Sequence, residues 1–318
     1  MDNEQLSGSL PGLHKLLNLS IAKNGPQTIG RFAPSPSGDL HFGSLVTALA
    51  GFLIARQHHG KWLLRIDDID QPRCKPGADD NIKRTLQAHG LSWDDDVLYQ
   101  SQRLDAYDQI LEWLWQHDLV YGCQCTRKQI KAKGDLYTGT CRPKNLSGEG
   151  HAVRLKNPGD TSVLRDKILG TPAIPADILN EDFVIKRRDG LHAYHLVSVI
   201  DDLAQGVTQI VRGADLLFPS ACQVVLYRLF AVPLPEFLHI PLAVSEPGKK
   251  LSKQNHSPCL DNSHAGENLA AALAFLGAKV PSELSVCPVS DILDWALEHW
   301  KWTDLGADTE KMVSQRWC

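Results

Sequence analysis

Apolar and polar positions alternate along the first third of the chain in a way that predicts strands and helices in turn. Residues 28–35 (TIGRFAPS) form a short apolar run that stops at prolines, which predicts a strand. A mostly apolar stretch from about Gly43 to Gly60 predicts a helix. Residues 61–68 (KWLLRIDD) predict a second strand.

The pattern continues with helices over residues 77–90 and 104–118 and a strand over residues 119–125. Strands that alternate with helices usually pair in parallel and are covered by those helices. The fold class predicted for the chain is therefore α/β.

The middle of the chain reads differently, as strands and turns inserted before the alternation resumes. The inserted strand-and-turn stretches are residues 151–157, 182–190 and 191–213. The resumed pattern is a helix over 214–231, a strand over 236–244, and two helical segments over 266–278 and 290–300.

Composition sets only broad limits on function. The chain has 318 residues, of which 43% are apolar and 22% charged, and its formal net charge is −4, as in an ordinary globular protein of one or two domains. A local basic cluster departs from this balance, because the segment from Cys123 to Lys144 contains six cations and only one acid, Asp135. These cations are Arg127, Lys128, Lys131, Lys133, Arg142 and Lys144. The cluster could contact phosphates or be a solvated loop.

The N-terminus carries Asp2 and Glu4 and lacks a sustained apolar core, so no secretory signal is predicted. No run is apolar and long enough to predict a membrane span. Five scattered cysteines are expected to be reduced thiols of a cytoplasmic protein. They are Cys74, Cys222, Cys259, Cys287 and Cys318.

The other three cysteines, Cys123, Cys125 and Cys141, cluster within nineteen residues. A structural zinc site needs four ligands, usually Cys or His, and no His lies between Cys123 and Cys141. Either this stretch binds no metal or its fourth ligand is unusual.

Neither common phosphate-binding motif, G-x-G-x-x-G or G-x-x-x-x-G-K-[ST], is present. The first predicted strand is instead followed by RFAPSPSGDLHFGSL, in which His41 stands at the mouth of a helix. Free N–H groups and the positive dipole at a helix N-terminus suit a polyphosphate. On this segment alone, His41 could equally be a capping residue.

A lysine segment, KKLSKQN, follows about two hundred residues later and contains Lys249, Lys250 and Lys253. HFGS (41–44) together with KLSKQ (250–254) resembles the two signature sequences of class I aminoacyl-tRNA synthetases. Ser44 stands where the first signature normally has a second histidine, which implies a weaker phosphate contact.

The ordered set RFAPSPSGDLHFGSL, LLRIDDID, DDLAQGVTQIVRGADLL and KLSKQ is similar to the glutamyl branch of that class, over residues 28–255. The resemblance implies a Rossmann-type catalytic domain with an inserted, zinc-containing, acceptor-binding-like region and a short helical C-terminal tail. The expected division is 1–27 as an extension, 28–120 and 191–258 as the two catalytic halves, 121–190 as the inserted region, and 259–318 as the tail.

Only residues 256–318 follow the lysine segment, too few for the helical half with which glutamyl-tRNA synthetases read the anticodon. The chain therefore resembles most the shortened branch of the family. That branch activates L-glutamate with ATP and attaches it to the cyclopentenediol of queuosine, at the wobble position of tRNA(Asp). The resemblance implies ATP with Mg²⁺, one structural Zn²⁺, glutamate and the queuosine-bearing anticodon loop as ligands. It implies no membrane partner, and we expect a monomer.

The resemblance also assigns roles to individual residues. His41 and Lys253 are the candidate catalytic groups, and Gly43 and Ser44 join them in binding ATP. The candidate glutamate ligands are Arg31, Ser35, Asp67, Tyr194 and Arg212. Two planar guanidinium groups among these suit two carboxylates, whereas Lys249 and Lys250 are expected to be solvated neighbours.

Asp67 departs from the family, which has glutamate at this position of RIED. Its carboxylate is set back by about 1.5 Å, one covalent bond. We expect it to face the substrate ammonium, with glutamate specificity retained and binding modestly weaker.

The family pattern C-x-C, Tyr, Cys matches Cys123, Cys125, Tyr137 and Cys141, which would make a tyrosine oxygen the fourth zinc ligand. A closed shell of four ligands implies a structural site. Lys128, Lys131 and Lys133 are the candidates for contacts with the tRNA backbone.

Other interpretations stay open for the single residues. Arg31 could pair with Asp39 or Asp68 on the surface, and the acids of RIDDID could cap a turn. Tyr194 could be a core residue, and Arg212 a turn residue. For the whole chain, the alternatives are a compact glutamyl-tRNA synthetase that charges tRNA(Glu), or a synthetase-like protein that binds tRNA or zinc without catalysis.

Overall fold

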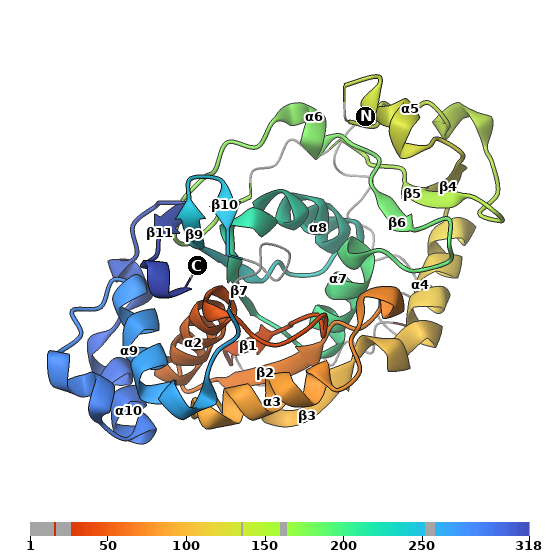
Figure 1. Ribbon diagram of the computed structural model, residues 1–318. Coiled ribbons are helices and arrows are strands. Elements are labelled where there is room, and N and C mark those ends of the chain that lie inside the picture. Colours follow the sequence, from red (N-terminus) through yellow and green to blue (C-terminus); the bar gives the residue numbers. More distant parts are fainter. Residues whose placement is uncertain (1–15, 17–26, 135, 160–163, 252–257, 318) are drawn as a thin grey trace.

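The computed structural model describes residue 16 and residues 27–134, 136–159, 164–251 and 258–317 (Figure 1). Nearly all of the predicted N-terminal extension, and most of the lysine segment with Lys253, lie outside the described residues.

A parallel sheet forms the centre of the molecule, as the alternating pattern predicts. Its strands are β1 (Ile29–Phe32), β2 (Lys61–Ile66), β3 (Asp94–Tyr99), β7 (Gln209–Gly213) and β8 (Glu236–Ile240). β1, β2 and β3 pair in parallel in that order, and β7 pairs in parallel with β8. The two groups meet where the Thr208 N–H donates to the Ile29 carbonyl at 2.9 Å, so β7 lies next to β1. Two sequence-distant halves of the chain thus meet at this point.

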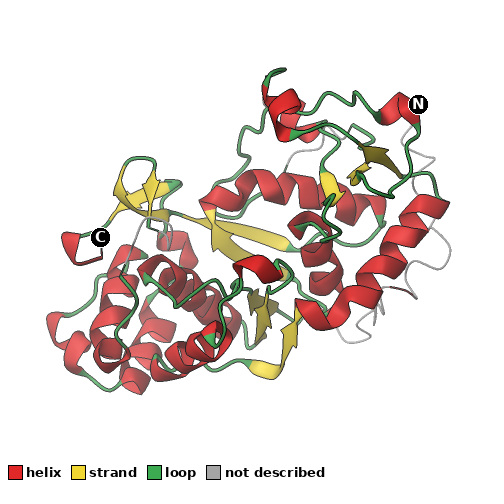
Figure 2. Cartoon of the chain, turned by 45° about the vertical axis from the view of Figure 1, so that its right-hand side comes forward, coloured by secondary structure: helices red, strands yellow, loops and turns green. Residues whose placement is uncertain are grey.

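Helices cover both faces of this sheet (Figure 2). The helices are α2 (Phe42–Gln57), α3 (Ala78–Ala88), α4 (Leu104–Gln116), α7 (Tyr194–Ala204), α8 (Leu217–Leu229), α9 (Ala265–Phe275) and α10 (Val289–His299). One hydrophobic core joins Val211 of β7 to α2, α9 and α10, and a second joins Ile210 to α4, α7 and α8. Side chains of successive residues in a strand point to opposite faces, so β7 contributes to both cores. The two C-terminal helices, α9 and α10, therefore share a hydrophobic core with the central sheet.

The long helix α2 is apolar on all sides because the sheet lies on one side of it and α9 with α10 on the other. Its C-terminal turn leads to Gly60, where the chain passes very close to β1. A Cβ at this glycine would lie 2.2 Å from the Thr28 carbonyl oxygen, so no larger residue fits without moving the backbone.

The prediction of strands and turns over residues 191–213 is wrong for its first half, which is helix α7. Leu196, Val197, Val199 and Ile200 are buried at helical spacing, facing α8 and α4. Val197, Val199 and Ile200 are β-branched and locally favour a strand, but tertiary packing overrides that weak preference. The second half, β7, is a strand as predicted.

A second, antiparallel sheet contains β4 (Val120–Cys123), β5 (Ala152–Leu155) and β6 (Val184–Lys186), which confirms three predicted strands. The short helix α5 (Arg127–Lys131) lies near this sheet at the upper right of Figure 1, and α6 (Ala176–Leu179) lies at the top, above α8.

A third sheet has the order β10-β9-β11 and contains β9 (Leu242–Glu246), β10 (Lys249–Lys250) and β11 (Glu310–Met312). The single strand predicted over 236–244 is therefore two strands, because Pro241 separates β8 from β9 and the two belong to different sheets. Pro lacks the N–H that a continuous strand would need.

No helix in the described part of the chain combines the length and the apolar character needed to cross a membrane.

Candidate active site

A cavity of about 670 Å³ opens beyond the C-terminal ends of β1 and β7, where open α/β sheets usually bind ligands. Its walls come from the β1–α2 loop, the start of α7, the end of β7 and the β9–β10 hairpin. Most of the predicted active-site residues among the described ones line it: Arg31, Ser35, His41, Gly43, Ser44, Tyr194 and Arg212. The predicted residue Asp67 is not among the lining residues.

The mouth of α2 forms one wall of the cavity. His41 is the N-cap residue, and its Nδ1 lies 3.3 Å from the Ser44 N–H, while its Nε2 lies 3.3 Å from the Ser44 hydroxyl. The first turn of α2 contains no acidic residue, so its dipole stays available to an anion. His41 is therefore a capping residue, as one interpretation predicted, and it also lines the cavity.

Arg212 provides the clearest signal for a ligand in this cavity. Its side chain on β7 is only 3% exposed, and its Nη1 donates to the Tyr194 hydroxyl at 3.2 Å. Nε and Nη2 are buried and have no hydrogen-bond partner among the described residues. Burial lowers the pKa of Arg212, and the charge of Arg31 adds to this effect. A buried guanidinium with two unsatisfied donors is costly unless an anion completes it.

Arg31 also lines the cavity, but it already has a carboxylate partner. Its Nε and Nη2 donate to the two oxygens of Asp202 on α7 at 3.0 and 3.4 Å, and both side chains are buried. The alternative pairing with Asp39 or Asp68 is therefore wrong. Asp202 fixes the direction of Arg31 and leaves Nη1 outside these two bonds.

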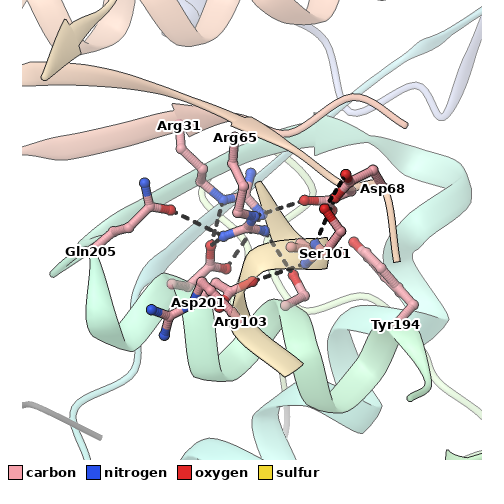
Figure 3. Close-up of polar contacts among 12 residues, drawn as sticks. Arg31, Arg65, Asp68, Ser101, Arg103, Tyr194, Asp201 and Gln205 are labelled. Atoms are coloured by element: carbon pink, nitrogen blue, oxygen red, sulfur yellow. Dashed lines mark hydrogen bonds and ion pairs between the residues drawn. The ribbon is translucent and has the colours of Figure 1, made fainter. Parts of the chain in front are cut away.

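Asp67 is buried and pairs with Arg65. Figure 3 shows the polar contacts around Arg65. The Asp67 carboxylate accepts from Arg65 Nε at 2.8 Å, and Arg65 Nη1 donates to Asp202 at 2.6 Å. Burial raises the pKa of Asp67 to about 6, against the opposing charge of Arg65. The bond to Arg65 uses Oδ1 of Asp67, and Asp67 is not a lining residue of the cavity.

Three charged residues of the cavity are not among the predicted site residues, and one of them, Lys250, was expected to be a solvated neighbour. Arg73, Asp215 and Lys250 line it, and Lys250 forms an ion pair with Asp215. Lys250 is thus a cavity residue, whereas Lys249 pairs with Glu246 on the exposed hairpin. Asp215 lies two residues beyond β7 in RGADLL, so its place after a strand was the available signal.

The three clustered cysteines lie together beside the antiparallel sheet. The sulfur atoms of Cys123, Cys125 and Cys141 are all within 4.8 Å of one another. The Tyr137 hydroxyl belongs to the same cluster, because it accepts from the Cys141 N–H at 2.7 Å. Burial raises the pKa of Tyr137, and hydrogen bonds with the Cys123 and Cys141 side chains add to this effect. The stacked Arg154 guanidinium lies 3.7 Å from the Tyr137 ring centre.

This donor set fits a zinc ion. Three sulfurs lie close together with the buried Tyr137 beside them, and a tetrahedral zinc site takes four ligands, most often from Cys or His. Burial raises the pKa of Cys141, but hydrogen bonds from the Gln124 backbone and from Cys125 outweigh this effect and lower the pKa to about 7. A thiolate, the form that binds metal, is therefore accessible at neutral pH.

Two residues of the basic cluster, Lys133 and Lys144, line a pocket together with Cys125 and Tyr137. α5 carries Lys128 and Lys131 and is capped by Thr126 and Gln129, whose side chains bond each other's backbone N–H. Lys128, Lys131 and Lys133 are exposed, as phosphate contacts require.

A family model described as tRNA synthetases class I (E and Q), catalytic domain, matches residues 28–278. The chain is 50% identical over 97% of its length to a glutamyl-Q tRNA(Asp) synthetase of Photobacterium profundum, of which it covers 99%. It is 48% identical over 87% of its length to the protein of that name in Escherichia coli K12, of which it covers 90%. A glutamate-tRNA synthetase structure from Elizabethkingia anophelis superposes with a TM-score of 0.75 at 25% identity, over 91% of this chain and 68% of that one.

Proposed function

Since the chain belongs to the glutamyl and glutaminyl group of class I tRNA synthetases, we propose that it activates L-glutamate with ATP and transfers it to queuosine in tRNA(Asp). The acceptor is the cyclopentenediol of queuosine at the wobble position. Relatives that are 48–50% identical along most of the chain are named glutamyl-Q tRNA(Asp) synthetase. Their names support this acceptor over the 3′ end of tRNA(Glu).

The observation that carries the proposal is the unsatisfied guanidinium of Arg212 in the cavity beside the mouth of α2. Planar donors at Nε and Nη2 match the two oxygens of a carboxylate. Tyr194, bonded to the same guanidinium, and Ser35 add hydroxyl groups to this pocket. A glutamate carboxylate at Arg212 would satisfy donors that otherwise cost free energy.

The first half-reaction joins an oxygen of the glutamate carboxylate to the α-phosphorus of ATP, and the bond from that phosphorus to pyrophosphate breaks. Positioning and charge stabilisation supply most of the catalysis in such a step. His41, Gly43, Ser44 and the free N–H groups of α2 would hold the phosphates. Lys253, outside the described residues, is the proposed cation for the leaving pyrophosphate. Bound with ATP, Mg²⁺ would neutralise phosphate charge.

Glutamate-dependent exchange between pyrophosphate and ATP without tRNA tests this activity. The proposal predicts exchange, because adenylate formation needs only the cavity described above. Absence of exchange would favour a binding protein or a compact glutamyl-tRNA synthetase, since members of that group typically need tRNA to activate glutamate.

Asp67 is proposed to act on the substrate ammonium, although its carboxylate now lies on Arg65. The variant Asp67→Glu extends the carboxylate by about 1.5 Å. It should lower the KM for glutamate roughly two- to tenfold, as one added hydrogen bond would. Steady-state exchange kinetics at varied glutamate measure this, and an unchanged KM would assign Asp67 to Arg65 alone.

For the inserted region 121–190 we propose a structural zinc site, with Cys123, Cys125, Tyr137 and Cys141 as ligands. When bound, the zinc would pin the segment that carries Lys128, Lys131 and Lys133 against the antiparallel sheet, in reach of tRNA phosphates. The halves 28–120 and 191–258, the extension 1–27 and the tail 259–318 complete the proposed division. A monomer in the cytoplasm is part of the same proposal.

A further inference from the structure

The C-terminal strap, residues 309–317, pairs with a strand of the active-site wall. β9 is the middle strand of its sheet, and its residues Leu242 and Ala243 line the cavity. β11 in the strap pairs in parallel with β9, and the Leu242 N–H donates to the Thr309 carbonyl at 2.9 Å. The strap thus completes one edge of β9.

The strap also holds the turn between β9 and β10. Glu310 accepts a hydrogen bond from the Gly248 N–H at 3.0 Å. Gly248 has a φ of 75°, which favours glycine, and it lines the cavity together with Lys250 two residues later. The Glu310 carboxylate therefore fixes the turn that leads into the lysine segment.

At its other end the strap reaches the mouth of α2. The Trp317 ring stacks on Phe42 with centroids 4.3 Å apart and planes at 21°, and Phe42 directly follows His41. Arg316 pairs with Glu267 of α9 at 2.8 Å, which anchors this end.

The two segments that the strap touches meet at the cavity. A Cβ placed on Gly43 would lie 3.7 Å from the Ala243 Cβ, so the mouth of α2 and β9 are in near contact. A small shift of either segment changes the space for the phosphates between them.

We propose that the C-terminal strap is a positioning element of the ATP site, with Glu310 and Trp317 as its positioning residues. Neither lines the cavity, so both act through the segments that do. This inference rests on the proposed function, and the strap lies beyond residues 28–278, which the family model matches.

The variant Glu310→Ala tests the contact to the turn. Glu310 is exposed, so its loss should leave the melting temperature unchanged. The KM for ATP in pyrophosphate exchange should rise about three- to tenfold, within the range of one typical hydrogen bond, while the KM for glutamate stays within error. Met312→Ala, whose side chain is 55% exposed on the same strand, is the matched control and should behave as wild type.

The variant Trp317→Ala tests the contact to α2, and Trp317→Phe should restore most of the loss because a ring remains on Phe42. A rise in the ATP KM for Glu310→Ala and Trp317→Ala, with rescue by phenylalanine, supports the strap. Equal rises in both KM values, or no change in either, would overturn it. If Trp317→Ala does not fold, Glu310→Ala decides alone.

Failure of the proposed function is distinguishable from failure of this inference. Wild-type protein without glutamate-dependent exchange would contradict the function. The strap is then judged by calorimetric ATP binding, where Glu310→Ala should bind about three- to tenfold more weakly than wild type. Equal affinities would overturn it.

Discussion

Replacing Arg212 with methionine is expected to lower kcat/KM for glutamate roughly a hundred- to a thousandfold. Removing one partner of a buried, hydrogen-bonded charge pair costs about 3 to 4 kcal/mol, which corresponds to this loss. The substrate carboxylate would then meet an apolar side chain in place of two N–H donors. Pyrophosphate exchange at varied glutamate measures the loss.

The same variant should keep or raise the melting temperature. Nε and Nη2 of Arg212 are buried without partners among the described residues, so the free protein gains nothing from them. Unpaired buried donors of this kind lower the stability of the free protein and are retained because they bind the substrate. Differential scanning calorimetry tests this directly.

Arg65→Met is the matched comparison in the same buried region. Arg65 is fully buried like Arg212, but Asp67 and Asp202 both pair with it. Removing it takes the partner from the buried Asp67 carboxylate and leaves Asp202 with Arg31 alone, which should destabilise the fold by about 3 to 5 kcal/mol. If Arg212→Met destabilised the protein as strongly as Arg65→Met, Arg212 would be a structural residue and not a ligand for substrate.

Cys141→Ala should abolish zinc binding and loosen the region around α5 and β4. The buried thiol contributes one of three converging sulfurs, and structural zinc sites contribute folding free energy through their ligands. Metal content by mass spectrometry should fall from about one zinc per chain to near zero, and amide exchange over 121–145 should rise. Cys287→Ala, a cysteine outside the cluster, should retain the metal.

Exchange activity without tRNA should survive Cys141→Ala, because the cysteine cluster belongs to a different sheet from the cavity. Transfer to tRNA should fall. Tyr137→Phe resolves the fourth ligand: reduced zinc occupancy supports the phenol oxygen, and full occupancy with unchanged amide exchange removes Tyr137 from the ligand set.

Local sequence was sufficient for the parts of the fold that depend on local pattern. β1, α2 and β2 follow from apolar runs bounded by Pro and Gly, and the HFGS motif falls where α2 begins. β3, by contrast, begins with three aspartates and becomes a strand only by pairing with β2. β11 likewise exists only because β9, some seventy residues earlier, accepts it. Strands that depend on such long-range pairing show no alternation of apolar and polar residues that a short window of sequence could reveal.

In the candidate active site, too, the sequence indicated which residues are present but not the long-range contacts that they make. Family motifs placed Arg31, Tyr194 and Arg212 on one cavity, but they could not show which guanidinium is already paired. Asp202, the partner of Arg31, lies on α7, the segment for which the sequence predicted strands and turns. The error about α7 therefore hid the residue that distinguishes Arg31 from Arg212.

Glutamate incorporation into tRNA from cells with and without queuosine tests the central claim most directly. The account predicts that tRNA(Asp) carrying queuosine accepts glutamate and that the queuosine-free pool does not. Undiminished charging of the queuosine-free pool, or charging of tRNA(Glu), would contradict it and leave a compact glutamyl-tRNA synthetase.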